Sequence, residues 1–296
     1  MTTLPPRERP ARLAVGAIGA GRVGATLAAA LDRAGHQAVA VAAVSQASRR
    51  RAEALVPAAA VLPPDEVAER ADLLVLAVPD DVLAPLVSGL AAAGAVRPGT
   101  LVAHTSGAHG FRVLDPLTST GALPMALHPV MTFTGTEVDL QRLAGACFGV
   151  TSPEPLRLGA EALVIEMGAE PVWIDEEDRA AYHAALAFGS NNLITLVSQA
   201  ADLLGDVGVE HPMRMLGPLL GAALDNALRR GDAALTGPVA RGDAGTVRAH
   251  LTSLTAPQVR AAYVAMSRLT ADRALAAGLL AAEDAESLLD VLAAEG

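Results

Sequence analysis

The sequence predicts an α/β domain with a doubly wound parallel sheet, followed by an all-α C-terminal domain. Short apolar segments alternate with helical patterns as far as about residue 175, which is typical of consecutive βα units. A glycine-rich turn joins the first apolar segment to the first helical pattern. From Glu176 onward the sequence shows long helical patterns and no convincing strand.

The predicted strands of the first part are short and aliphatic. One of them, Leu73–Val78, is apolar throughout, as expected of a central parallel strand that is buried on both faces. We expect strands at Leu13–Ile18, Ala38–Val44, Val61, Leu73–Val78, Thr100–His104, Phe148–Thr151 and Pro171–Ile174. The helices between them are expected at Val23–Ala34, Arg49–Leu55, Val82–Ala93 and Pro155–Met167.

The second part is expected to contain helices only. They are predicted at Arg179–Leu204, Met213–Arg229, Ala244–Leu254, Pro257–Ala277 and Glu283–Ala293. This change of pattern places the domain boundary near residue 175. We therefore expect a disordered N-terminal tail at residues 1–12, the α/β domain at residues 13–175 and the helical domain at residues 176–296.

The composition restricts the class of protein. A net charge of −10 argues against nucleic acid as the main partner, because binding phosphates requires clustered cations. A sole cysteine, Cys147, excludes an internal disulfide, and we expect it in the core of a strand. No set of His, Asp and Glu residues has the spacing of metal ligands, so no metal is predicted. Lysine is absent, which excludes Schiff-base chemistry. Without a signal peptide or a run of about 18 apolar residues, we expect a cytoplasmic protein with no membrane segment.

The glycine-rich turn has the dinucleotide-binding pattern GxGxxG between a predicted strand and a predicted helix. Gly19 permits the tight turn, Gly21 lets the backbone approach a pyrophosphate, and Gly24 allows the helix to pack on the strand. The start of the helix, with Arg22 and Val23, then offers N–H groups to the anion. A purely structural turn is the alternative. The pattern favours a Rossmann domain that binds a dinucleotide.

The end of the second predicted strand favours NADP(H) over NAD(H). An NAD site usually has an acidic residue here for the ribose 2′-hydroxyl, but no carboxylate occurs between Asp32 and Glu53. The segment instead carries hydroxyls and arginines that suit a 2′-phosphate, at Ser45, Ser48, Arg49, Arg50 and Arg51. A solvated basic start of a helix is the alternative.

The next buried strand ends in Val78-Pro79-Asp80-Asp81. We expect the backbone at Val78 and Pro79 to pass close to the ribose and the nicotinamide of the cofactor. The carboxylate of Asp80 or Asp81 is expected to cap the following helix.

Polar residues follow the later strands, at the edge where open α/β sheets bind ligands. His104 and Ser106 come at the end of one predicted strand, and His128 is expected on the next loop. Ser106 with Gly107 can offer a hydroxyl and a backbone N–H to a carboxylate. For each histidine, a structural role with hydrogen bonds to the backbone is the alternative.

Further polar residues lie in the helical part. His183 is an acid–base candidate, because an imidazole pKa of about 6.5 suits proton donation near neutral pH. Asn191 shares its predicted helix, and an amide that only joins helices is the alternative there. Arg241 lies on a glycine-rich loop and can bind a carboxylate through two hydrogen bonds. Asp243 is expected to cap the next helix.

The sequence resembles a bacterial group of Rossmann-like proteins whose C-terminal helical domain has long had no assigned function. The resemblance extends from Leu13 to about Leu254, and it rests on Gly19–Gly24, His104-Thr105-Ser106-Gly107, His128-Pro129, Tyr182-His183 with Asn191, and Thr236–Asp243. That group is similar to the 6-phosphogluconate dehydrogenase superfamily, which includes β-hydroxyacid dehydrogenases and ketopantoate reductases.

The resemblance implies an NADPH-dependent reductase of a small 2-oxo acid, with ketopantoate favoured and pantothenate biosynthesis as its setting. The alternatives are another β-hydroxy acid, a cyclic imine such as pyrroline-5-carboxylate, or a non-enzymatic NADP(H)-binding regulatory protein. The superfamily's lysine acid–base group has no counterpart in this lysine-free chain, so another side chain must take that role. His183 with Asn191 is the first candidate, and His104 and His128 follow.

Two further expectations concern the binding of the substrate carboxylate and the oligomeric state. Ser106 and Arg241 are expected to hold the carboxylate of a small anionic substrate. The helical domain has more apolar faces than one small bundle buries, so we expect it to form a homodimer.

Overall fold

The computed structural model describes residues 12–294. The chain divides into two compact units, Met1–Gly189 and Ser190–Gly296, and the division falls inside helix α8 (Arg179–Asp206). The predicted disordered tail lies outside the described residues except for Arg12. The guanidinium of Arg12 donates a hydrogen bond to the carbonyl oxygen of Ala34 at 2.7 Å, so this residue is tied to the domain.

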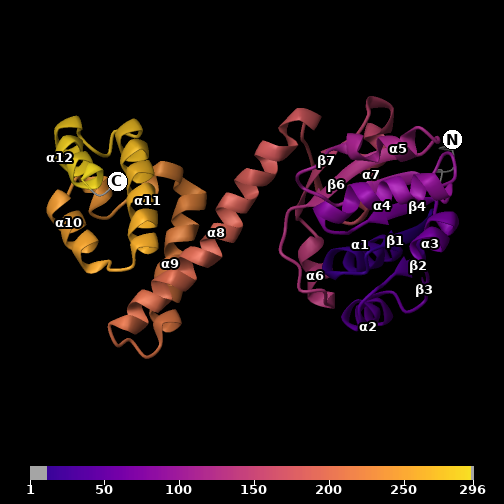
Figure 1. Ribbon diagram of the computed structural model, residues 1–296, viewed down its shortest axis with the longest axis horizontal. Helices are drawn as coiled ribbons and strands as arrows, with labels where there is room; N and C mark the ends of the chain where they lie inside the picture. The colour runs from indigo at the N-terminus through magenta and orange to yellow at the C-terminus, as the bar shows by residue number, and fades with distance from the viewer. Residues whose placement is uncertain (1–11, 295–296) are drawn as a thin grey trace, which may run out of the picture. The chain divides into compact units, whose positions relative to one another are not determined.

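The first unit is built on an eight-stranded sheet with the order β3-β2-β1-β4-β5-β6-β7-β8 (Figure 1). Neighbouring strands are parallel except for β6 and β7, which are antiparallel. The strands are β1 (Ala14–Ile18), β2 (Gln37–Ala42), β3 (Ala60–Val61), β4 (Leu73–Leu76), β5 (Leu101–His104), β6 (Leu123–Pro129), β7 (Cys147–Thr151) and β8 (Glu170–Trp173). Because β1, β4, β5 and β6 are parallel neighbours, their carboxyl ends meet at one edge of the sheet.

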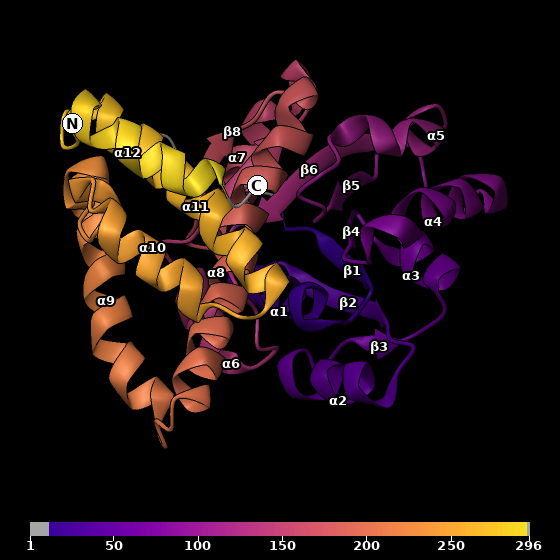
Figure 2. The same cartoon turned by 60° about the vertical axis from the view of Figure 1, so that its left-hand side comes forward.

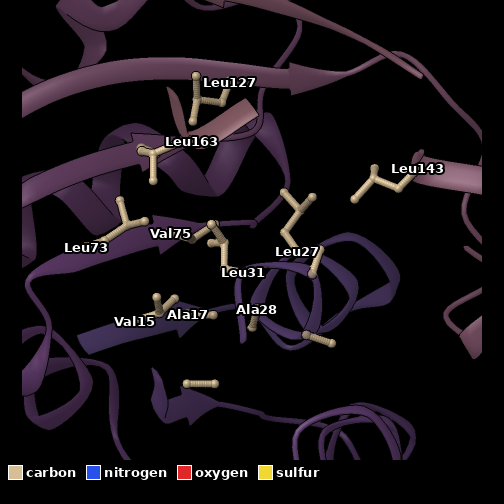
Figure 3. Close-up of a cluster of buried hydrophobic side chains, with 14 of the residues drawn as sticks. Val15, Ala17, Leu27, Ala28, Leu31, Leu73, Val75, Leu127, Leu143 and Leu163 are labelled. Atoms are coloured by element: carbon tan, nitrogen blue, oxygen red, sulfur yellow. The ribbon is translucent and has the colours of Figure 1, made fainter. Parts of the chain in front are cut away.

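Helices cover both faces of the sheet. They are α1 (Arg22–Arg33), α2 (Gln46–Leu55), α3 (Pro64–Arg70), α4 (Asp80–Ala93), α5 (Asp115–Thr118), α6 (Glu137–Leu143) and α7 (Arg157–Glu166). Side chains of β4 alternate between the faces, because successive residues of a strand point to opposite sides. Leu73 and Val75 join the core cluster with α1, α6 and α7 (Figure 3), and Leu74 and Leu76 join the cluster with α3 and α4.

Every strand and helix that the sequence predicts is present, with ends that differ by a few residues. The loop predicted for His128 is wrong, since His128 and Pro129 are the last residues of β6. Pro124 and Pro129 obscured this strand, because proline is rare in central strands. The short helices α3, α5 and α6 were also not predicted, since each is too short for a clear apolar period.

The first unit continues beyond residue 175, the predicted boundary, to Gly189. The reason is that the first turn of α8 packs against β7. Arg179 donates to the carbonyl oxygen of Gly149, and the phenol of Tyr182 lies against the same glycine. The described residues contain no strand after β8.

The second unit consists of the rest of α8 with α9 (Pro212–Arg230), α10 (Ala244–Ser253), α11 (Pro257–Ala276) and α12 (Ala282–Ala293). Helix α12 packs against α10 and α11 (Figure 2), and Val247, Leu251, Ala271 and Leu288 are buried between them. No helix of residues 12–294 is long and apolar enough to cross a membrane.

Candidate functional site

The glycines of the fingerprint turn are required by local geometry. Gly19 has a φ of +96°, which other residues rarely adopt. A Cβ on Gly24 would approach the carbonyl oxygen of Gly19 and would lie 2.9 Å from the Cβ of Ala77. Among the described residues, a Cβ on Gly21 would meet only the oxygen of Gly19, at 3.9 Å, so the backbone at Gly21 is open. Gly21 precedes α1 without a side-chain cap, which leaves the helix N–H groups available to an anion.

A groove of about 400 Å³ follows this turn. It lies at the carboxyl ends of β1, β2 and β4 and includes Ala42, Ala77 and Leu86 among its lining residues. The predicted cofactor residues that line it are Gly19, Gly21, Ser45, Ser48, Val78 and Pro79. Arg22, Val23 and Gly24 lie in the first turn of α1 beside the groove.

The basic segment after β2 begins helix α2. Ser45 is the N-cap, and its hydroxyl accepts a hydrogen bond from the backbone N–H of Ser48 at 3.1 Å. Arg49 and Arg50 are exposed on α2. Arg51, the third arginine of this segment, donates to the carbonyl oxygen of Ala20 at 3.4 Å and thereby contacts the fingerprint turn.

A loop near the groove is fixed by one buried carboxylate. Asp139 accepts hydrogen bonds from the backbone N–H groups of Thr134 and Gly135, at 2.8 and 2.6 Å, and from the hydroxyl of Thr134. Burial raises the pKa of Asp139, but these hydrogen bonds outweigh burial and hold the pKa below its usual value. The loop reaches Arg22 and Arg51, since a Cβ on Gly135 would contact both side chains.

The helix after β4 begins differently from the prediction. Pro79 is the N-cap of α4, so neither Asp80 nor Asp81 caps it, and the predicted cap is wrong. Both carboxylates lie in the first turn instead, where the positive end of the helix dipole stabilises their negative charge.

His104 is fully buried at the end of β5, and both of its ring nitrogens are occupied. Its Nδ1 accepts from the backbone N–H of Ser106 at 3.2 Å, so its Nε2 carries the proton and donates to the carbonyl oxygen of Gly110 at 2.8 Å. Burial lowers the pKa of His104 to about 4. This histidine therefore holds the turn after β5 in place. The hydroxyl of Ser106 accepts from the N–H of His109 at 3.2 Å and can still donate its own proton.

His128 lies beside Tyr182 at the same edge of the sheet. Its Nδ1 is 2.8 Å from the tyrosine hydroxyl, and the two rings are perpendicular. Burial, followed by the charge of Arg179, lowers the pKa of His128 to about 4, so the ring is neutral at pH 7. A neutral ring that accepts the phenolic proton at Nδ1 carries its own proton at Nε2.

His183 and His128 meet over Gly107. The two rings are 5.9 Å apart and nearly perpendicular. A Cβ on Gly107 would lie 2.6 Å from Cδ2 of His183 and 3.0 Å from Nε2 of His128, so only glycine leaves room for both. The structure thus brings His104, Ser106, His128 and His183 to one place, at the carboxyl ends of β5 and β6 and the start of α8.

Arg179 is the residue of this cluster that the sequence interpretation missed. It is 1% exposed, and one of its nitrogens donates to the carbonyl oxygen of Gly149 at 3.3 Å. Among residues 12–294 its Nε and Nη1 have no hydrogen-bond partner although both are buried, and its guanidinium lies 5.7 Å from the ring centre of Tyr182. Its place at the first position of α8, where a cation opposes the helix dipole, is a signal that could have identified it.

The remaining predicted site residues belong to the second unit. Asn191 is exposed on α8, and Arg241 is exposed on the short 3₁₀ turn Val239–Arg241. The helix cap predicted for Asp243 is confirmed, because its carboxylate accepts from the N–H and the hydroxyl of Thr246. The contributions of Asn191 and Arg241 to a site stay predictions.

Two family models match this chain. Residues 3–129 match the Rossmann-like domain, and residues 146–270 match DUF2520, a domain of unknown function. Together they describe a Rossmann-like domain followed by a DUF2520 domain. No curated protein sequence matches the chain.

Solved structures with the same fold cover nearly the whole chain. A Bacteroides fragilis protein provisionally named an NADP oxidoreductase is 25% identical with a TM-score of 0.73, and the match covers 88% of this chain and 98% of that one. A Thermotoga maritima protein, TM1727, is 19% identical with a TM-score of 0.67 and the same coverage. Pyrroline carboxylate reductase of Plasmodium falciparum, solved with NADP bound, is 13% identical with a TM-score of 0.55 over 89% of this chain and 97% of that one.

Proposed function

We propose that this protein is an NADPH-dependent reductase that transfers hydride to the carbon of a small carbonyl or imine substrate. The observation that carries the proposal is the meeting of two features at one sheet edge. The glycine-lined groove lies at the ends of β1 and β4, and the histidine cluster lies at the ends of the adjacent β5 and β6. A nicotinamide bound along this edge has polar groups beside it that can orient and protonate a substrate oxygen.

The comparisons support the same class of reaction. The Bacteroides fragilis protein carries the name of an NADP oxidoreductase, and the Plasmodium falciparum enzyme reduces a pyrroline carboxylate. Ser45 and Ser48 in the groove, with Arg49 and Arg50 after them, favour NADPH because hydroxyls and guanidinium groups suit a 2′-phosphate.

The proposed substrate is a small 2-oxo acid, with ketopantoate the first choice. Ser106 offers a hydroxyl inside the cluster, and Arg241 is the proposed partner for a carboxylate. The choice of ketopantoate depends on the family resemblance alone. Pyrroline-5-carboxylate and β-hydroxy acids are the alternatives.

The test is a direct assay of the purified chain with NADPH against ketopantoate, pyrroline-5-carboxylate and a panel of 2-oxo acids. We expect substrate-dependent oxidation of NADPH. If ketopantoate gives a kcat/KM below about 10² M⁻¹s⁻¹, far under the usual range for enzymes, while another acid exceeds it, ketopantoate is rejected and the reductase stands. Tight NADPH binding without turnover of any carbonyl or imine would instead favour a regulatory NADP(H)-binding protein.

We also propose a homodimer formed through the second unit. Its helices carry many exposed apolar side chains, and patches of this kind mark protein interfaces. On α8 and α9 they are Leu193, Ile194, Leu196, Met213, Met215, Leu219, Leu224 and Leu228.

A further inference from the structure

We propose that Tyr182 supplies the proton for the reduction through His128, and that Arg179 stabilises the tyrosinate that remains. The inference rests on the proposed reductase function and assigns the source of the proton. Tyr182 and Arg179 act through His128, so both are positioning residues, and His128 is the group that meets the substrate.

The first support is the hydrogen bond between Tyr182 and His128, whose phenolic oxygen and Nδ1 are 2.8 Å apart. When the phenol is the donor, the proton on the neutral imidazole resides on Nε2. The Nε2 side of the ring faces Gly107, where a Cβ would come within 3.0 Å of that atom. His128 is only partly buried, and we place the substrate oxygen on this side of the ring.

The second support is the unpaired charge of Arg179. A buried guanidinium without an anion is unfavourable, and removing that penalty requires a negative charge nearby. The charge of Glu176 raises the pKa of Arg179, but the two carboxylate oxygens of Glu176 already accept hydrogen bonds from the backbone N–H groups of Phe111 and Arg112. A tyrosinate at Tyr182, whose ring centre is 5.7 Å from the guanidinium, supplies the missing anion. Because the guanidinium of Arg179 gains this anionic partner only as the reaction proceeds, its charge stabilises the transition state more than the ground state.

The step balances in atoms and charge. NADPH held at the glycine-lined groove would supply the hydride for the new C–H bond on the substrate carbon and would be oxidised to NADP⁺. As the C=O bond opens, its oxygen takes the proton from Nε2 of His128. Nδ1 of His128 takes the proton of Tyr182 at the same time, so the imidazole stays neutral and Tyr182 becomes a tyrosinate. After the product leaves, Nδ1 of His128 returns its proton to the tyrosinate and Nε2 takes a proton from the solvent, which restores both groups.

The transfer of a proton from Tyr182 through His128 to the substrate is called the relay below. Neighbouring ionisable groups shift the pKa values of both residues. Burial raises the pKa of Tyr182, the charge of Arg179 opposes this rise, and Cys147 on β7 adds to it. For His128, Arg179 and His183 lower the pKa and Asp80 raises it. Since these effects hold His128 neutral, it cannot serve as a charged acid, and it needs a second group to replace its proton.

The relay can be tested in the free protein, because Tyr182 and Tyr263 are the only tyrosines. In a Tyr263→Phe background, 3-fluorotyrosine reports the ionisation of position 182 by ¹⁹F NMR, and fluorination makes the phenol acidic enough to titrate in the folded protein. We expect Arg179→Gln to shift this titration to higher pH, because it removes the stabilising cation. Arg179→Lys keeps the charge and is expected to titrate near the parent protein.

Arg157→Gln is the matched control. Arg157 also lies over an aromatic ring, 4.0 Å from the centre of Trp173, but it belongs to α7 and not to the relay. Its replacement should leave the titration of position 182 unchanged. An unchanged titration in Arg179→Gln would overturn the role of Arg179, whether or not the protein proves to be a reductase.

The second measurement is turnover of Tyr182→Phe with the best substrate of the panel. We expect kcat to fall about 10²-fold, with NADPH affinity unchanged. The decline of kcat at high pH, which reports loss of the phenolic proton, should disappear in this variant. A kcat and pH profile equal to those of the parent protein would overturn the relay and leave the reductase standing. A parent protein that turns over nothing overturns the reductase, and the relay with it.

Discussion

His104, which is buried, and His128, which is partly buried, make the stability of the first unit depend on pH. His104 and His128 have folded pKa values of about 4, against 6.5 for an unperturbed histidine. Between these pH values the unfolded chain binds more protons than the folded one, so stability is complete above pH 6.5 and is lost as the pH falls toward 4. For His104 alone the loss is about 3 kcal/mol.

Urea unfolding at several pH values checks this expectation. His104→Gln removes the titrating ring and should lose less stability between pH 6.5 and 4 than the parent protein. The comparison within one background cancels the contribution of the carboxylates. An equal loss in both proteins would show that His104 is not buried in its neutral form.

His183 is expected to orient the carbonyl of the substrate over Gly107, as its contact with His128 suggests. Replacing it with alanine should lower kcat by about 10²–10⁴-fold, with little change in NADPH affinity. Steady-state kinetics and a fluorescence titration of NADPH separate the two effects. A kcat close to that of the parent protein would move this role to Asn191 or to another group.

At the scale of elements, helix α2 is expected to determine cofactor choice. Arg49→Ala combined with Arg50→Ala should weaken NADPH much more than NADH, because each contact with a 2′-phosphate contributes about 1.5–3 kcal/mol. Isothermal titration with both cofactors measures this. Arg70→Ala on α3, an exposed arginine paired with Glu66, is the control and should change neither affinity. Equal weakening of both cofactors by the double variant would refute the assignment.

The sequence predicts those elements whose local pattern is strong. The alternation of strands and helices, the fingerprint turn and the five long C-terminal helices depend on apolar period and glycine chemistry, which are local properties. Strand β6 was missed because Pro124 and Pro129 break its pattern, although sheet pairing on both sides holds it in place.

The candidate site was predicted only in part, for a related reason. Glycine spacing identifies the cofactor turn, and position after a strand identifies His104. The contact between His128 and Tyr182 joins residues 54 apart in the chain, and the burial of Arg179 depends on how α8 packs on β7. Such facts belong to tertiary structure and leave no periodic signal in the sequence.

At the scale of the whole molecule, the apolar helices of the second unit lead to an expectation about assembly. Light scattering at micromolar concentration should show about twice the monomer mass of 30.0 kDa. Replacing Leu219 and Leu228, which are 64% and 79% exposed on α9, with glutamate should shift the protein toward the monomer. A parent protein that scatters only as a monomer would contradict the homodimer.

The close approach of Tyr182 to Gly149 links two positions in evolution. Gly149 has an ordinary strand conformation, so nothing in its own backbone demands glycine. It must lack a side chain because the phenol of Tyr182 occupies the space where a Cβ would lie. Homologous sequences should therefore keep or lose glycine at 149 and tyrosine at 182 together. In homologues without a tyrosine at position 182, any strand-forming residue can occupy position 149. The residue at position 149 therefore indicates whether a homologue has the phenol.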